Sequence, residues 1–588
     1  MHSAHELLTR WPALDVGAKR ARLNNSLHLS PDLAVAVGGS TAIAERTAVA
    51  LWSADPSAWS RDQAAQKAIG ERLGWMQSPK LMADSIERLQ AFADGIRRDG
   101  FTDVVLLGMG GSSLAPEVLR AVVGVAPGWP RLHMLDSTDP AAVRAAATEA
   151  RSTLYLLASK SGTTIEPNSL AAHFRQRLLD SGVDRWASHF VAITDEGTEL
   201  DRRARSEQFR ELFINPSDIG GRYSALSFFG MVPAALMGQD VGEIVGWSLA
   251  MLAAAEPGTA AAIGNPAVAL GLAMGAAARD GRDKLTLVAP PSLDAFGLWI
   301  EQLIAESTGK HGTGVVPIAG EPLADPARYG IDRLFVQMRS HGAPGEDERE
   351  AGLRALKAAQ TPVIEIDFPE TLALGAEFVR WEIATAVAGA ILRIDPFDQP
   401  NVQQAKDATN VLLGEYKKTR RLPVAAPDQT LQGISLTLSS AARASLPASS
   451  GTSLLSLLRP GDYFGLLAYL GPDPSLAEEL QRLRRQVRDR ARVATMFGYG
   501  PRYLHSTGQL HKGGPDSGLF VLVSATPAED VPIPGEPFSF GTLELAQATG
   551  DFTSLEAAGR RAVHAHLPSP DPALIRALAD ALLSHIGK

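Results

Sequence analysis

Hydroxyl side chains gather in one short segment of the chain. The apolar run TLYLLA (153–158) predicts a strand, and four hydroxyls and one ammonium follow it within six residues: Ser159, Lys160, Ser161, Thr163 and Thr164. Hydroxyls and backbone N–H groups at a strand-to-helix turn can surround the oxygens of a phosphate ester. A helix cap is the common alternative, but a cap accounts for one hydroxyl and not for four. We therefore predict a phosphomonoester pocket, in which Lys160 either adds charge or points into solvent.

A glycine-rich turn follows another predicted strand, DVVLLG (103–108). The turn reads Gly108-Met109-Gly110-Gly111-Ser112-Ser113 and leads into a helix, whose N-terminus attracts anions. A tight turn that only packs a strand on a helix needs the same glycines. A dinucleotide-binding fold also places glycines here and an acid about 20 residues later, where Asp136 stands. The spacing differs from G-x-G-x-x-G, because Ser113 takes the place of the last glycine.

Arg222 follows two glycines and precedes an apolar helix pattern. A guanidinium held behind glycines can present a fixed cation to an oxyanion. The same position also suits a surface arginine in a loop, and the residues alone leave both interpretations open.

The segments around these turns alternate between short apolar runs and amphipathic helices. This alternation predicts an α/β fold with parallel sheets covered by helices on both faces. We expect a helical N-terminal region at 1–90, a first sheet domain at 91–255, a second sheet domain made of 256–418 and 458–588, and a linker or loop at 419–457, which is rich in Ser, Ala and Pro.

Composition excludes several kinds of protein. The chain has 588 residues, no cysteine and a formal net charge of −9. Without cysteine it has no disulfide, no thiolate nucleophile and no cysteine-ligated zinc. An acidic protein repels nucleic acid. The N-terminus lacks the pattern of a signal peptide. The longest uncharged stretch, 257–278, is too weakly apolar to span a membrane. We expect a cytoplasmic protein that binds neither nucleic acid nor membranes.

Six motifs resemble those of glucose-6-phosphate isomerases. They are LLGMGGSSLAPE, SKSGTTIEP, GGRYSALS, WIEQLIAESTGK, DPFDQPNVQQAK and YLHSTGQL, and they span residues 106–510. The first two motifs are shared by sugar isomerase domains in general, and the other four are specific to the isomerase. The chain most resembles the isomerase half of fused transaldolase–glucose-6-phosphate isomerase proteins, but nothing before residue 90 resembles a transaldolase barrel. The resemblance implies two flavodoxin-like sugar isomerase domains, each an α/β/α sandwich.

The resemblance also implies roles for individual residues. Glu306 matches the catalytic base, and Gln302 lies one helical turn before it on the same face. Arg222 matches the arginine near the developing enediolate, Lys406 an active-site lysine, and His505 the ring-opening histidine. The matching substrate-binding positions are Gly111, Ser112, Ser159, Lys160, Ser161, Thr163, Thr164, Gln302 and Gln399.

The implied activity is the interconversion of glucose 6-phosphate and fructose 6-phosphate, as in glycolysis and gluconeogenesis. It proceeds by ring opening and a cis-enediolate, with no metal and no other cofactor. The resemblance implies a homodimer with the active site at the subunit interface and the histidine donated across it. In the family the histidine motif precedes the FDQP motif, whereas here His505 comes almost a hundred residues after Lys406. The altered order leaves open which subunit supplies His505.

Two other functions fit part of the sequence. A non-catalytic sugar-phosphate sensor needs the turn at 159–164 but not Glu306, Lys406 and His505. It would usually carry a DNA-binding module, and the sequence suggests none. A nicotinamide-dependent oxidoreductase would use the turn at Gly108 and the acid at position 136.

For two further groups of residues, a structural role is expected rather than a functional one. His564 and His566 share one face of a possible strand, and without a third ligand at suitable spacing we expect a surface pair rather than a metal site. The arginines between 482 and 492 lie at helical spacing near acidic residues, so we expect a solvated face with salt bridges rather than a nucleic-acid site.

Overall fold

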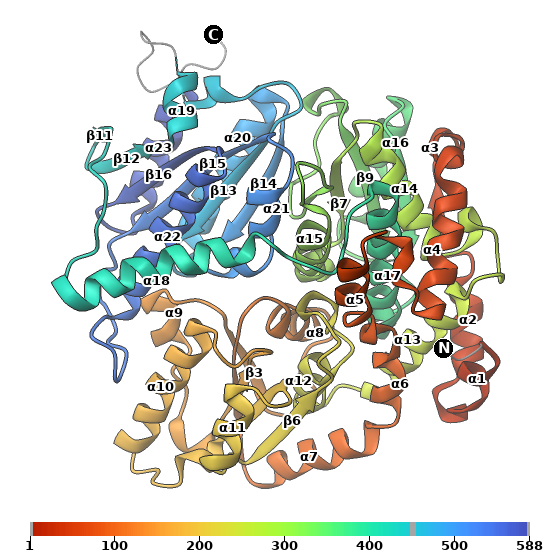
Figure 1. The fold of residues 1–588 in the computed structure, drawn as a ribbon, viewed down its shortest axis with the longest axis horizontal. Helices are drawn as coiled ribbons and strands as arrows, with labels where there is room; N and C mark the ends of the chain where they lie inside the picture. Colours follow the sequence, from red (N-terminus) through yellow and green to blue (C-terminus); the bar gives the residue numbers. More distant parts are fainter. Residues whose placement is uncertain (1–3, 341, 447–453, 585–588) are drawn as a thin grey trace.

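The computed structural model describes residues 4–340, 342–446 and 454–584 (Figure 1). Within these residues the chain forms three sheets flanked by helices, with strand orders β3-β2-β4-β5-β6, β8-β7-β9-β10-β1 and β14-β13-β15-β16-β12-β11. The predicted α/β class with parallel-sheet domains is confirmed. The assignment of 256–418 and 458–588 to one sheet domain was wrong, because the C-terminal segment builds a sheet of its own.

The first sheet lies within the predicted first domain. Its five parallel strands are β2 (Asp103–Gly108), β3 (Arg131–Leu135), β4 (Thr153–Ala158), β5 (Phe190–Asp195) and β6 (Glu211–Asn215). Every residue of β2, β4 and β5 is buried, as in a sheet that helices cover on both faces. The flanking helices are α8 (Leu114–Val122), α9 (Pro140–Ala145), α10 (Ile165–Asp180), α11 (Glu199–Ser206) and α12 (Phe228–Leu236).

The strand order of the first sheet marks a place for a ligand. In chain order it reads 2-1-3-4-5, so the direction in which strands are added reverses between β2 and β4. Ligands of open parallel sheets bind outside the carboxyl ends of the strands at such a switch point. The glycine-rich turn follows β2 and the hydroxyl-rich turn follows β4, so the two turns lie on either side of this switch point.

The second sheet has four parallel strands and one short antiparallel strand. The parallel strands are β7 (Lys284–Val288), β8 (Val316–Ile318), β9 (Arg333–Arg339) and β10 (Val363–Asp367). β1 (Leu27–Leu29) comes from the N-terminal region and pairs with β10. That region was predicted to be helical, and three residues are too few to produce a recognisable strand pattern. Around the sheet lie α13 (Val241–Ala255), α14 (Val268–Arg279), α15 (Asp294–Thr308), α16 (Glu346–Ala358) and α17 (Leu374–Leu392).

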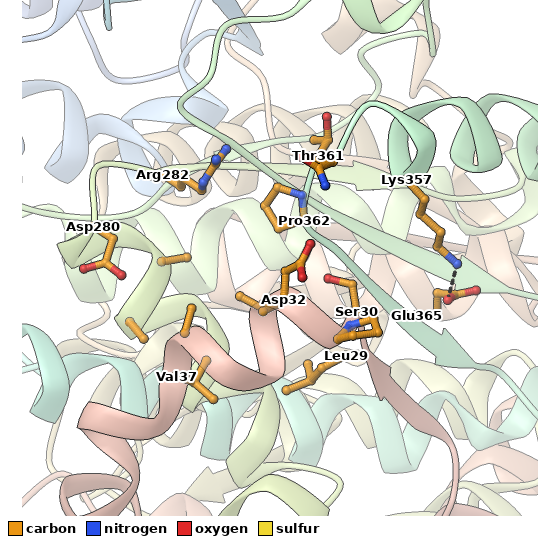
Figure 2. A pocket seen from close by; sticks show the side chains of 16 residues that line it. Leu29, Ser30, Asp32, Val37, Asp280, Arg282, Lys357, Thr361, Pro362 and Glu365 are labelled. Carbon is orange, nitrogen blue, oxygen red and sulfur yellow. Dashed lines mark hydrogen bonds and ion pairs between the residues drawn. The ribbon is translucent and has the colours of Figure 1, made fainter.

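Among the described residues, seven α-helices precede the first sheet domain. They are α1 (Ala4–Thr9), α2 (Val16–Leu23), α3 (Pro31–Ala36), α4 (Thr41–Ser53), α5 (Gln63–Gly70), α6 (Ser78–Ala83) and α7 (Ile86–Arg98). α3 and β1 border a cavity of about 380 Å³ against the second sheet domain. Figure 2 shows Asp32 near Pro362 there and a dashed line between Lys357 and Glu365. The Lys357 ammonium lies 2.5 Å from a carboxylate oxygen of Glu365. This cavity contains none of the predicted site residues.

The third sheet includes residues that were predicted to be a linker. Its strands are β11 (Gln429–Leu431), β12 (Ile434–Leu438), β13 (Tyr463–Tyr469), β14 (Ala494–Tyr499), β15 (Gly518–Ala525) and β16 (Arg561–Leu567). β11 and β12 form an antiparallel hairpin that joins the sheet through β16. The linker prediction for 419–457 was therefore wrong at these strands, and its residues 447–453 lie outside the described part of the chain. β12 alternates between buried and half-buried residues. The neighbouring Ser and Ala residues made this alternation hard to recognise in the sequence.

The third sheet is flanked by helices, some of which also contact the rest of the molecule. They are α19 (Ser440–Ser445), α20 (Pro474–Ala491), α21 (Gly508–Gly513), α22 (Phe540–Ala557) and α23 (Pro572–Leu583). α18 (Val402–Thr419) packs against α22 and lies between the first and third sheet domains (Figure 1). Apolar residues of α18 and α22 share one core with α10, so the two domains are joined by a continuous apolar contact.

Two interpretations of surface residues were only partly right: Arg482 pairs with Glu479, as expected of a salt-bridged face, but other residues are buried. Arg484 of α20 is buried and donates to the carbonyls of Ala319 and Gly320, which ties the third sheet domain to the second. His564 and His566 lie on the central strand β16, where both bond the Ser524 hydroxyl. Burial lowers the pKa of His564 to about 3, so this histidine is a neutral part of the core, whereas His566 is half-buried.

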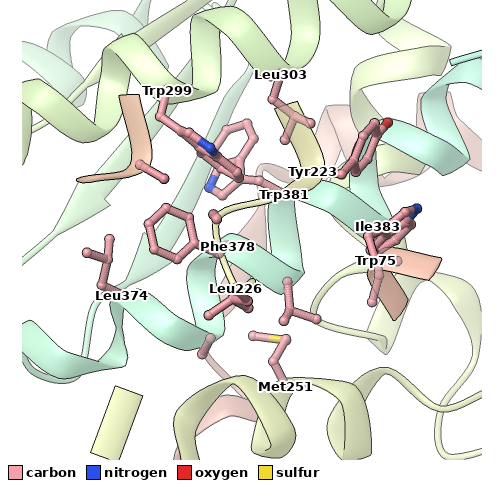
Figure 3. Close-up of a cluster of buried hydrophobic side chains, with 14 of the residues drawn as sticks. Trp75, Tyr223, Leu226, Met251, Trp299, Leu303, Leu374, Phe378, Trp381 and Ile383 are labelled. Atoms are coloured by element: carbon pink, nitrogen blue, oxygen red, sulfur yellow. The ribbon is translucent and has the colours of Figure 1, made fainter. Parts of the chain in front are cut away.

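An aromatic cluster underlies the segment that carries Arg222. Tyr223 stacks on Trp75 with ring centroids 5.1 Å apart, and Trp381 and Phe378 belong to the same cluster (Figure 3). Aromatic side chains supply large buried areas with a defined geometry. The core thus anchors the residue next to Arg222, which restricts the position of the arginine itself.

Candidate active site

One cavity of about 470 Å³ lies at the carboxyl ends of β2 and β4. Elements of all three sheet domains enclose it, including α15, α18 and the short 3-10 helix η14 (Arg502–His505). All predicted site residues except Thr163 line it: Gly111, Ser112, Ser159, Lys160, Ser161, Thr164, Arg222, Gln302, Glu306, Gln399, Lys406 and His505.

The hydroxyl-rich turn is not consumed by helix capping. Thr164 is the N-cap residue of α10, yet its side chain makes no capping hydrogen bond. The Ser159 Oγ accepts from the Gly162 N–H at 3.1 Å, which folds the turn back on itself. Gly162 has φ +73°, and a Cβ there would lie 2.5 Å from the Leu200 nitrogen, so only glycine fits. The arrangement leaves hydroxyls and the α10 N-terminus facing the cavity region, as an anion site requires.

Lys160 adds little free charge to the turn. Its ammonium bonds the carboxylate of Asp195 and donates to the Ser217 carbonyl at 2.9 Å. Burial raises the pKa of Asp195, although the hydrogen bond from Lys160 acts in the opposite direction. A phosphate here would therefore be held mainly by hydroxyls, N–H groups and the helix end.

The glycine-rich turn is the point where three segments of the chain meet. Gly110 has φ +56°, and a Cβ there would lie 2.6 Å from the His505 carbonyl oxygen. A Cβ on Gly111 would lie 1.9 Å from the Gly221 oxygen. These two glycines allow the backbones that carry His505 and Arg222 to approach the first sheet.

Gln302 orients the carboxylate of Glu306. Its Nε2 donates to Glu306 Oε2 at 3.2 Å and to the His505 carbonyl at 2.8 Å. The other carboxylate oxygen lies 3.4 Å from Arg222 Nη1. The side chain of Glu306 is 11% exposed, and that exposed part lines the cavity.

Arg222 is a fixed, buried cation. Its guanidinium donates to Ser307 Oγ at 2.7 Å, Gln399 Oε1 at 3.1 Å, the Pro396 carbonyl at 2.7 Å and the Asp398 carbonyl at 2.9 Å. The same contacts bring Gln399 to the cavity. A guanidinium with this many fixed partners keeps its position while charge changes beside it.

Lys310 is a supporting residue that the sequence analysis did not single out. Its ammonium binds Asp398 Oδ1 at 2.5 Å and the Asp398 carbonyl at 2.6 Å, on the segment that Arg222 also holds. Burial, followed by the nearby Arg222, lowers the pKa of Lys310 to about 8, against the influence of Asp398. In the sequence, Lys310 is the last residue of the motif EQLIAESTGK, and this position could have pointed to it.

Glu166 is a second residue that the sequence analysis missed. Its Oε1 lies 2.9 Å from His505 Nε2, and its side chain is only 4% exposed. Burial alone would raise the pKa of this carboxyl, but His505 and then Lys406 outweigh it and the pKa is lowered. His505 Nδ1 has no hydrogen-bond partner within the part of the chain that the structure describes, so it is available to a ligand.

His505 reaches the cavity of its own chain. The resemblance implied a histidine donated by a partner subunit, and the altered motif order left its origin open. Here the third sheet domain covers the cavity, and the hydrogen bond from Gln302 holds the backbone of His505 beside α15. The unusual chain order is therefore compatible with one compact site.

The features required by an oxidoreductase are engaged elsewhere. Both carboxylate oxygens of Asp136 bind Arg502, at 2.7 and 2.8 Å, so this acid does not face a ribose.

Among the described residues, no helix is both long and apolar enough to cross a membrane. Within the same residues, no three His, Asp or Glu side chains are grouped to hold a metal ion.

The fold and the site together define an α/β protein of the sugar isomerase type. A solved structure of a hypothetical protein from Thermus thermophilus shares the fold, with a TM-score of 0.55 and 23% identity, over 66% of this chain and 99% of that one. A family model described as phosphoglucose isomerase matches residues 79–311.

Curated relatives identify the family. A glucose-6-phosphate isomerase from Rubrobacter xylanophilus is 31% identical over 392 residues, which are 58% of this chain and 89% of the relative. One from Nostoc sp. is 29% identical over 397 residues, with 58% and 74% covered. The chain belongs to the glucose-6-phosphate isomerase family.

Proposed function

We propose that the protein is an enzyme that interconverts D-glucose 6-phosphate and D-fructose 6-phosphate. Family membership supports this reaction. The observation that carries it is that Glu306 and His505 line one cavity together with Ser159, Ser161 and Thr164 of the hydroxyl-rich turn. A sensor would need the turn alone, so the presence of an acid, a histidine and Lys406 around the same space favours catalysis.

The phosphate acts as a handle that positions the reacting carbons. Ser159, Ser161 and Thr164 and the N-terminus of α10 hold its oxygens, close to the switch point of the first sheet. Binding a remote group in this way converts a loosely oriented substrate into one whose C1 and C2 lie near the catalytic groups.

Ring opening is assigned to His505. The hydrogen bond to Glu166 engages Nε2, so Nδ1 faces the substrate and moves the proton between the ring oxygen and the C1 hydroxyl. An imidazole titrates near neutrality and suits this exchange. Lys406 lines the same wall and assists by holding a hydroxyl or the opening ring oxygen.

Proton transfer is assigned to Glu306. Its carboxylate removes the proton from C2 and returns it to C1, which gives a cis-enediolate between the two steps. Arg222 lies beside this carboxylate as a fixed cation, so it stabilises the negative charge that develops on the enediolate oxygens. Each step uses side chains of this chain.

The direct test is an assay of the purified protein with each sugar phosphate and no added cofactor. Formation of the other sugar phosphate is the expected result. If neither is converted while inorganic phosphate or the sugar phosphates bind, the sensor alternative would replace the enzyme.

Thr164→Val is expected to raise KM for glucose 6-phosphate about 10- to 100-fold and to change kcat little. The variant keeps the shape of the side chain and removes one hydrogen bond to a charged group, which is worth about 1.5–3 kcal/mol. Thr163→Val is the matched control, because Thr163 belongs to the same turn but does not line the cavity. Equal effects of both variants in steady-state kinetics would contradict the proposed phosphate site.

We also propose a cytoplasmic homodimer. The family resemblance supports the dimer, and the absence of cysteine fits a reducing compartment. Sedimentation of the purified protein tests the assembly, and a monomer at micromolar concentration would contradict it. Fractionation of the source cells tests the location.

A further inference from the structure

Glu166 has a second hydrogen-bond donor besides His505. The same oxygen, Oε1, accepts from Gln547 Nε2 at 2.7 Å. Gln547 lies on α22 of the third sheet domain and is 2% exposed. Its own Oε1 accepts from the Thr138 hydroxyl at 2.7 Å, and Thr138 is fully buried in the first sheet domain. A chain of hydrogen bonds therefore runs from Thr138 through Gln547 and Glu166 to His505.

The direction of this chain is fixed by chemistry. An ionised carboxylate only accepts hydrogen bonds, so the amide of Gln547 must turn its NH₂ group toward Glu166. The amide oxygen then faces the Thr138 hydroxyl, which can donate to it. A flipped amide would set two acceptors against each other in a buried place, where an unmatched polar pair is costly.

Other charged or titratable groups face Glu166 as well. His505 comes from η14, Lys406 from α18 and the Tyr469 hydroxyl from β13. His505 and Lys406 favour the ionised carboxylate, while burial opposes it. Both side chains also line the catalytic cavity and are engaged by the proposed reaction. Gln547 does not line that cavity, so its donor is available to Glu166 throughout the reaction.

We propose that Gln547 is a positioning residue that keeps Glu166 ionised and aimed at His505 Nε2. This orientation leaves His505 Nδ1 for the substrate. The inference rests on the proposed ring-opening role of His505 and adds a residue of the same sheet domain, Gln547, on which that role depends. Burial favours the protonated form of Glu166, and the hydrogen bond from Gln547 acts against it. Without this donor, the carboxyl of Glu166 would take up a proton at a higher pH.

Gln547→Met tests the donor directly. Methionine has nearly the same length and no N–H group, and it fills the space better than alanine, which would admit water from the neighbouring cavity of about 290 Å³ that Gln547 borders. We expect kcat to fall about tenfold, which corresponds to about 1.4 kcal/mol, and KM to change less than twofold. The acid limb of the kcat–pH profile should move to higher pH. Unchanged kcat and an unchanged pH profile would overturn the proposal.

Gln547→Glu separates positioning from packing. It keeps the shape but places a second carboxyl against Glu166, and two adjacent carboxyls share one proton when the pH is low enough. The ratio of variant to wild-type kcat should therefore be lowest at high pH and rise as the pH falls, because the shared proton restores a donor. A packing role predicts the same ratio at every pH.

Thr138→Val tests the other end of the hydrogen-bond chain. Valine matches threonine in shape and leaves the amide without its second anchor, so we expect a two- to threefold loss of kcat. If Gln547→Met does not fold, the pH-dependent ratio of Gln547→Glu and the Thr138→Val loss decide the matter. A wild-type protein without isomerase activity would refute the proposed function, whereas active wild type with unaffected Gln547 variants would refute only this inference.

Discussion

Glu306→Gln is expected to lower kcat by about 10³- to 10⁴-fold while glucose 6-phosphate still binds. The amide cannot accept the C2 proton, and general acid–base groups contribute factors up to about this size. The side chain keeps its shape, and its single oxygen can still accept from either Gln302 or Arg222, which contact different oxygens of the carboxylate. Steady-state kinetics measure the loss, and titration calorimetry checks that the sugar phosphate binds within about threefold of wild type.

Glu301→Gln is the matched control for this variant. Glu301 lies on the same helix, α15, but its Oε1 accepts from the Ala319 N–H at 2.8 Å, and it does not line the cavity. Burial raises the pKa of Glu301 to about 8, so the carboxyl is largely neutral at pH 7 and an amide resembles it. We expect kcat within twofold of wild type. If Glu306→Gln stayed near wild type, or both variants lost activity alike, Glu306 would not be the base.

His505→Gln is expected to lower kcat by about 10²- to 10³-fold through loss of ring opening. The amide nitrogen of glutamine can still donate to Glu166, so the pair keeps its geometry, but glutamine cannot exchange a proton with the substrate. Ring opening and closing without C2 proton transfer interconverts the α and β anomers of glucose 6-phosphate. NMR exchange between the anomers therefore isolates the step assigned to His505.

The two variants should separate the two chemical steps. Glu306→Gln should still accelerate anomer exchange, because His505 is intact, and His505→Gln should not. Accelerated exchange in the His505 variant at the wild-type rate would assign ring opening to another group, and Lys406 would be the first to test, since it lines the same wall.

Local patterns predicted the two ligand turns of the cavity, whereas Glu306, Lys406 and His505 came from the motif resemblance. β2 and β4 are continuous apolar runs followed by glycines and hydroxyls, so the sequence contains both the strands and the ligand turns at their ends. Gln302 and Glu306 lie one turn apart on one helix, and their shared face follows from helical geometry alone. The motif resemblance supplied the roles, and the cavity brings these residues together.

Long-range contacts were the part that the sequence did not reveal. Glu166 is separated from His505 by 339 residues and from Gln547 by 381, so no local spacing connects them. Arg484 has acidic neighbours and resembles a surface residue, yet its partners are carbonyls of the second sheet domain. β12 alternates within a Ser-rich segment, and its pairing with β11 and β16 makes it a strand. Tertiary contacts override local composition in each of these cases.

A crystal structure with bound fructose 6-phosphate or glucose 6-phosphate is the most direct measurement of the central claim. The account predicts that the phosphate lies on the turn at 159–164, with C1 and C2 between the Glu306 carboxylate and His505 of the same chain. A phosphate bound elsewhere, or a sugar whose C2 lies out of reach of Glu306 in every subunit, would contradict it.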